Sequence, residues 1–122
     1  ELVHRRAVRF IFSKYNRLDS PTELMRDNQI PPLNTRRKMS RILFLYNILT
    51  SKVSLNSLPY LNQLSSRKTR HTRDHALQPI FAKTNAFKHS FFPRTISDWN
   101  LLPETIIQSA NFIQALEQYL IR

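Results

Sequence analysis

The chain has 122 residues, of which 41% are hydrophobic, so it can form one globular domain and is too apolar for a disordered tail. It contains no cysteine and no glycine, which excludes disulfides, zinc knuckles, thiol catalysis and the usual glycine-rich phosphate loops. The formal net charge is +11, and residues 1–94 hold 18 Lys and Arg against 5 acids, whereas residues 95–122 are slightly acidic. Such a basic body favours a polyanionic partner, with nucleic acid ahead of a membrane surface.

Two helices are predicted in the N-terminal part, and the first of them is amphipathic. Over residues 2–16, apolar side chains from Val8 to Tyr15 recur at helical spacing, and arginines occupy another face. A capping-box sequence beginning at Ser20, with proline at the first helical position, predicts a short helix over residues 21–28. The double proline that follows is expected to end this helix.

The longest predicted helix covers residues 33–50. It carries the widest apolar face of the chain, so we expect it at the centre of the core. Its first turns are basic, although cations near a helix N-terminus oppose the helix dipole by roughly a few tenths of a kcal/mol each. Residues 51–78 are rich in serine and asparagine, and we interpret them as an irregular basic connection within the domain.

The C-terminal part predicts one short hairpin and two helices. Apolar residues alternate weakly over residues 79–92, which favours two short strands joined by a turn at Thr84. A short helix is expected over about 95–100, and a last helix over about 110–121, capped by Ser109. The predicted fold is therefore mainly α, a small helical α+β domain with one short β-hairpin.

No catalytic or metal site is predicted, and no cofactor or small-molecule ligand is implied. The 8 acids are scattered, whereas a polymerase or nuclease needs two or three carboxylates that converge on a divalent metal. His71 and His75 are four residues apart, but arginines flank them and the glutamate of a metalloprotease helix is missing. Asp98 follows Arg94 at the spacing of an intrahelical ion pair, which is the role that we expect for it.

Two clusters of cations without interspersed acids are the candidate nucleic-acid-binding residues. One lies at the start of the long helix, and the other lies in the irregular connection. They comprise Arg36, Arg37, Lys38 and Arg41, and Arg67, Lys68, Arg70 and Arg73. Each cluster could also be an ordinary solvated surface, but the lack of acids favours contacts to phosphate. Nothing in either cluster indicates base-specific recognition.

Aromatic and aliphatic residues near the C-terminus are assigned mainly to the core. The predicted structural set is Phe91, Phe92, Ile96, Trp99 and Leu102. Base stacking by the aromatic members is the alternative. We favour packing because tryptophan is usually highly buried.

The string SFFPRTISDWNLLP over residues 90–103 is more specific than any other part of the chain. It resembles the signature near the C-terminus of reverse transcriptases from non-LTR retrotransposons, the jockey-like and chicken-repeat-like long interspersed elements. Residues 4–11, 32–46, 66–70 and 81–88 also resemble this family, so the similarity extends over nearly the whole chain. The family commonly has glycine at two places where this chain has Gln29 and Ser51.

The resemblance implies that the chain is the C-terminal segment of an element-encoded polyprotein, with an endonuclease and an RNA-directed DNA polymerase upstream. The segment alone would not be an enzyme. It would hold template RNA or target DNA near the polymerase during target-primed reverse transcription. The resemblance also implies an intracellular location, in a cytoplasmic ribonucleoprotein and in the nucleus.

Three hypotheses follow from these observations. The first is a non-catalytic segment that binds RNA or DNA through phosphate contacts. The second is a structural module whose apolar helix faces pack on the upstream polymerase thumb, with Val8, Phe12 and Tyr15 exposed in the isolated chain. The third is the relic of an inactive element that still folds.

Overall fold

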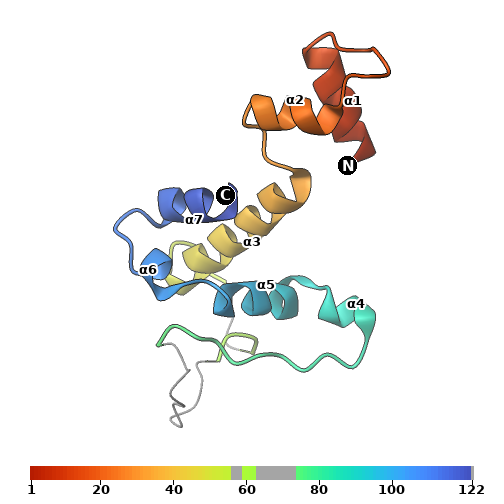
Figure 1. The fold of residues 1–122 in the computed structure, drawn as a ribbon. Coiled ribbons are helices and arrows are strands. Elements are labelled where there is room, and N and C mark those ends of the chain that lie inside the picture. Colours follow the sequence, from red (N-terminus) through yellow and green to blue (C-terminus); the bar gives the residue numbers. More distant parts are fainter. Residues whose placement is uncertain (56–58, 63–73, 122) are drawn as a thin grey trace. The chain divides into compact units, whose positions relative to one another are not determined.

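The computed structural model describes residues 1–55, 59–62 and 74–121. Within these ranges the chain forms seven helices and no strand (Figure 1). Their bounds are α1 Leu2–Ile11, α2 Pro21–Asp27, α3 Leu33–Leu49, α4 Asn85–Lys88, α5 Phe91–Asn100, α6 Glu104–Ile107 and α7 Phe112–Ile121. They group into two compact units, Glu1–Arg37 and Lys38–Leu120. Cooperative folding of the two units as one domain stays a prediction.

The mainly helical fold is confirmed, whereas the predicted hairpin is wrong. Thr84 does not make a strand turn but caps α4: its Oγ1 accepts a hydrogen bond from the Phe87 N–H at 3.2 Å. The alternation over residues 79–92 was short and weak, and the side-chain cap of α4 and the start of α5 at Phe91 prevail over it. Residues 78–83 are not helical and have no strand partner among the described residues.

Helix α5, which contains most of the string SFFPRTISDWNLLP, begins earlier than expected. It starts at Phe91, after Ser90 in an extended conformation, and so includes Pro93 in its first turn. Proline is tolerated there because the first four N–H groups of a helix have no intrahelical acceptor. At the other end of the chain, α7 begins after Asn111, whose Oδ1 accepts from the Gln114 N–H, and not after the predicted cap Ser109.

The first unit has a very small core. Of its residues only Val8 in α1 and Met25 in α2 are buried apolar side chains. The loop between these helices is held by Arg9, whose Nη2 donates to the Asp19 carbonyl at 2.7 Å. Outside this core, several large apolar side chains of the unit are exposed, including Val3 at 80%.

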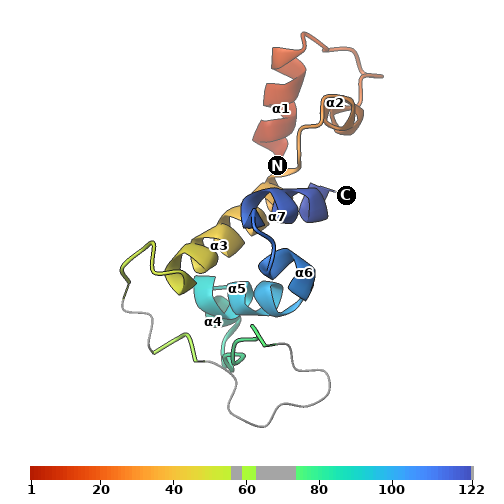
Figure 2. The same ribbon diagram turned by 90° about the vertical axis from the view of Figure 1, so that its left-hand side faces the viewer.

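The second unit has a single larger core. In Figures 1 and 2, helices α5, α6 and α7 gather around α3. The buried core consists of Ile42, Leu45, Leu77, Ile96, Trp99, Leu102, Ile106, Phe112 and Leu116. Aromatic contacts tie the helices together, since Tyr46 of α3 stacks on Phe112 of α7 with ring centroids 4.2 Å apart. The long helix is therefore central to the core of this unit, as its apolar face predicts.

The first three helices end in the same way, and without glycine. Ser13, Gln29 and Ser51 have φ of 51°, 55° and 56°, each two residues beyond the last residue of its helix. Each turn carries the two backbone hydrogen bonds of a Schellman motif; after α2 these are Gln29 N–H to Arg26 O and Ile30 N–H to Met25 O. Glycine is the usual residue at this left-handed position, and other residues adopt it at a cost in free energy.

Candidate nucleic-acid interface

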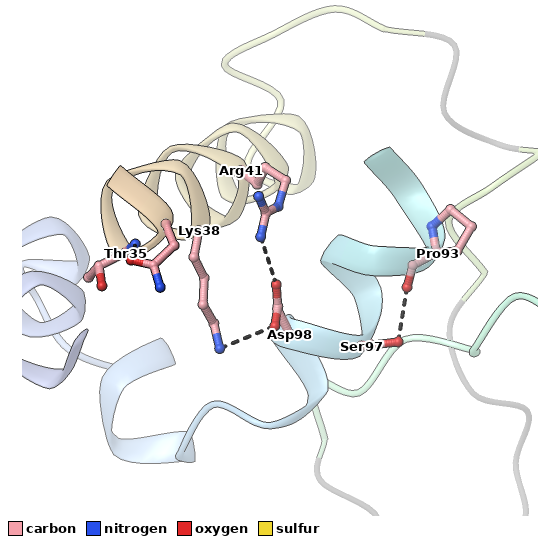
Figure 3. A network of polar contacts seen from close by, with 7 residues as sticks. Thr35, Lys38, Arg41, Pro93, Ser97 and Asp98 are labelled. Carbon is pink, nitrogen blue, oxygen red and sulfur yellow. Dashed lines mark hydrogen bonds and ion pairs between the residues drawn. The ribbon is translucent and has the colours of Figure 1, made fainter. Parts of the chain in front are cut away.

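The basic cluster on α3 is only partly available for an external anion. Lys38 and Arg41 belong to the second unit, and both bind Asp98 of α5 (Figure 3). Lys38 Nζ lies 3.1 Å from Asp98 Oδ1, and Arg41 Nη2 lies 3.2 Å from Asp98 Oδ2. The Asp98 side chain is 19% exposed, so these pairs are more than surface contacts. They fasten α3 to α5.

This arrangement corrects the role predicted for Asp98. We expected an intrahelical pair with Arg94, but both carboxylate oxygens of Asp98 bind cations of α3. It also explains two of the cations in the first half of α3, Lys38 and Arg41, since the attraction to a largely buried carboxylate outweighs the small unfavourable interaction with the helix dipole.

The other two cations of the α3 cluster lie in the first unit. Arg36 and Arg37 are both exposed on α3. Arg37 makes no ion pair with any residue that the structure describes. The second predicted cluster, Arg67, Lys68, Arg70 and Arg73, lies outside the described residues.

The predicted structural set occupies the core of the second unit and its edge. Ile96, Trp99 and Leu102 are buried, and Trp99 is 3% exposed. Phe91 and Phe92 are half-buried and pack on other aromatic rings, since Phe92 stacks on Tyr60 with centroids 4.6 Å apart. A ring as enclosed as that of Trp99 has no free face for a base.

Two adjacent side chains of α5 bind the backbone of the segment over residues 75–77. Trp99 Nε1 donates to the His75 carbonyl at 2.9 Å. The Asn100 side chain forms a pair of hydrogen bonds with the backbone of Leu77, accepting from its N–H at 2.9 Å and donating to its carbonyl at 2.8 Å. The pattern Trp-Asn in the family-like string therefore has a structural role: it fixes a loop backbone against α5.

Sequence reasoning missed a third group of cations. Lys83, Lys88 and Arg94 are exposed and make no ion pair with any described residue. A signal for them exists in the sequence, because no acid occurs between Asp74 and Asp98. The signal was weak because the three cations are spread along the chain. Lys88 and Arg94 line the same hollow only because α4 and α5 bring them together in the fold.

The described residues contain no group of three His, Asp or Glu side chains arranged to hold a metal ion. Across the same part of the chain, none of the helices has the length and apolar character needed to cross a bilayer. A hollow of about 300 Å³ is lined by Tyr46, His75 and Trp99, among other described residues.

Comparison with known proteins gave no relative for this chain: no protein-family model, curated protein or solved structure matches it.

Proposed function

We propose that this chain binds nucleic acid through phosphate contacts, without sequence specificity and without catalysis, as the C-terminal segment of a retrotransposon reverse transcriptase. The observation that carries the proposal is electrostatic. The chain has a net charge of +11, and the exposed cations Arg37, Lys88 and Arg94 make no ion pair with the described residues. Exposed cations without acidic neighbours are the usual means by which proteins bind a phosphate backbone.

The helix ends support the family part of this proposal. The retrotransposon enzymes commonly have glycine where this chain has Gln29 and Ser51, and both residues adopt positive φ. A glycine is expected at such a position for a physical reason, because it alone has no side chain to oppose the left-handed conformation. Positive φ at Gln29 and Ser51 is what a glycine at each position would accommodate, and this agreement supports the family part of the proposal.

The test is binding of the 122-residue chain to labelled single-stranded RNA, duplex DNA and heparin over a series of salt concentrations. We expect micromolar affinity for nucleic acid and a steep, linear fall of log K with log salt. The double variant Arg67→Glu and Arg70→Glu tests the basic connection and should flatten the salt slope by about one unit per lost contact. Absence of nucleic-acid binding at moderate salt, or binding to heparin alone, would contradict the proposal.

One observation favours the second candidate function, a module that packs on another protein domain. On α1, Val3, Phe10 and Ile11 are 80%, 73% and 66% exposed. These are not the residues expected from the sequence, since Val8 is buried and only Tyr15 of the predicted set is strongly exposed. If this function holds, Phe10→Ser should reduce binding of the chain to the polymerase domain and leave nucleic-acid affinity unchanged.

A further inference from the structure

A second hollow of the second unit has properties that the proposed function does not use. It has a volume of about 500 Å³ and lies between residues 80–82 and helices α4 and α5. Figure 1 shows the segment that leads into α4 running alongside α5. The residues that decide its chemistry are Phe81, Lys88, His89, Arg94, Ser97 and Asp98. We call this hollow the α4–α5 groove.

The groove is positively charged because Asp98, the only carboxylate among the described residues that line it, is neutralised by cations of α3. Asp98 lies four residues after Arg94 on α5 and would be the natural partner for that guanidinium. Both Asp98 oxygens are instead taken by cations of α3, at 3.1 Å and 3.2 Å. Arg94 and Lys88 are left exposed in the groove without an ion pair to any described residue.

The groove also has an aromatic side chain that is turned to solvent. The Phe81 side chain is 83% exposed, which is the largest exposed fraction of any aromatic residue that the structure describes. A single exposed apolar residue is ordinary on a protein surface. Phe81 differs because it lines a hollow together with two exposed cations, neither of which has an ion-pair partner in the described part of the chain. An aromatic face beside cations is the combination that binds single-stranded nucleic acid, by base stacking and phosphate contact together.

Two polar side chains of the groove, Ser97 and Asp98, are already engaged within the protein. The Ser97 hydroxyl donates to the Pro93 carbonyl at 3.0 Å, and the Asp98 oxygens are engaged (Figure 3). These groups are therefore occupied within the protein, and a base would be held mainly by its face. Stacking tolerates every base, since every base has a π face.

From these observations we infer that the α4–α5 groove binds a single strand of RNA or DNA, with Phe81 stacking on an unpaired base and Lys88 and Arg94 contacting the adjoining phosphates. This inference rests on the proposed function and specifies its substrate class. A duplex would satisfy the two cations but would not present a base face to Phe81. A volume of about 500 Å³ is in the range of small-ligand sites and accommodates an unstacked base.

The test compares fluorescein-labelled single-stranded and duplex oligonucleotides of equal length in anisotropy titrations with the 122-residue chain. We expect Phe81→Ala to weaken single-strand binding by roughly tenfold, the effect typical of losing one stacked base, and to leave duplex binding unchanged. Phe81→Trp should restore single-strand affinity, whereas Phe81→Leu should not, because leucine keeps the apolar bulk and lacks the π face. Phe81 is exposed, so none of these changes should alter the circular-dichroism melting curve.

A matched pair of double variants tests the phosphate contacts. Lys88→Gln with Arg94→Gln removes two charges from the groove, and Lys14→Gln with Arg17→Gln removes two exposed charges from the first unit. We expect the groove variant to lower the salt slope for single strands by about two units, and the control to change it less.

The outcomes separate the two proposals. If the unmodified chain binds neither RNA nor DNA, the proposed function fails. If it binds both but Phe81→Ala leaves single-strand affinity unchanged, or the two double variants lower the slope equally, the groove is not the binding site and the proposed function stands. Loss of duplex affinity in Phe81→Ala equal to the loss for single strands would also overturn the assignment.

Discussion

The two compact units of this chain are both built from amphipathic helices but differ in how many apolar helix faces converge. In the first unit α1 and α2 pack on each other and bury only Val8 and Met25. In the second unit α3, α5, α6 and α7 share one core of nine buried residues. Amphipathic helices therefore do not by themselves supply a core; the number of faces that meet decides how much surface is buried.

The difference extends to the polar contacts. The second unit fastens its helices with a half-buried carboxylate that binds two cations and with the Asn100 side chain on a loop backbone. In the first unit, the ion pair between Arg26 and Asp27 has side chains that are 76% and 65% exposed. We therefore expect the second unit to contribute most of the unfolding free energy of the chain. The stability of the first unit should depend more on any partner that covers its exposed apolar side chains.

Truncation of the two cores should give the largest effect and the clearest contrast. Leu116→Ala removes a fully buried side chain and is expected to cost about 2–5 kcal/mol of unfolding free energy. Met25→Ala should cost less, at the lower end of this range or below, because the small first core can collapse around the cavity. Denaturant unfolding followed by circular dichroism measures both.

The control for this pair is Leu18→Ala, since Leu18 is 95% exposed and its truncation should change stability by less than about 0.5 kcal/mol. Equal costs at Met25 and Leu116 would break the comparison, because they would show that both cores are packed equally well. A single shared transition in all three variants would support the predicted single domain, and two separate transitions would contradict it.

Removal of the Asp98 carboxylate should have the next largest effect. Asp98→Asn leaves Lys38 and Arg41 without their anion, and the expected cost is about 1–2 kcal/mol. The value is placed low because the Lys38 side chain is 34% exposed and solvent screens part of its interaction. Thermal or denaturant unfolding at neutral pH gives the measurement.

Asp27→Asn is the matched control in the first unit. Its pair with Arg26 spans 3.7 Å between exposed side chains, so we expect no measurable loss. If Asp98→Asn is no more harmful than Asp27→Asn, the contact between α3 and α5 is not a source of stability and the contrast between the units rests on apolar packing alone.

The sequence analysis predicted features that depend on local interactions and missed those that depend on contacts between residues far apart in the chain. The starts of α2 and α3 were predicted because proline and the apolar period are local signals, and α3 was correctly expected at the centre of the core. The partner of Asp98 was missed because Arg41 lies 57 residues away, whereas Arg94 stands at the ordinary helical spacing. A local spacing cannot show that a distant helix offers two cations to the same carboxylate.

The candidate site shows the same limit. Charge clustering along the chain indicated Arg36 to Arg41, and half of that cluster is engaged in holding two helices together. The α4–α5 groove was not found because Phe81, Lys88 and Arg94 belong to separate elements and meet only in the fold. Replacing the expected hairpin by α4 and α5 is what creates the groove, so the error in secondary structure and the missed site have one cause.

The smallest expected effect comes from the helix ends, and the same substitution should have opposite signs at two positions. Gln29 has a φ of 55°, so Gln29→Gly relieves the steric cost of the left-handed conformation and should raise stability by about 0.5–1 kcal/mol. Gln118 lies within α7 and is exposed, so Gln118→Gly should lower stability by up to about 1 kcal/mol through the poor helix propensity of glycine. Unfolding free energies of the two variants and the parent chain give both numbers.

If the units unfold together, the gain in stability from Gln29→Gly appears in the common transition. If they unfold separately, it appears only in the first unit, and the two glycine variants then report on different transitions. A loss of stability at both positions would mean that the Schellman turn after α2 is not formed in solution. The positive φ of Gln29 would then no longer support the comparison with a family glycine at that position.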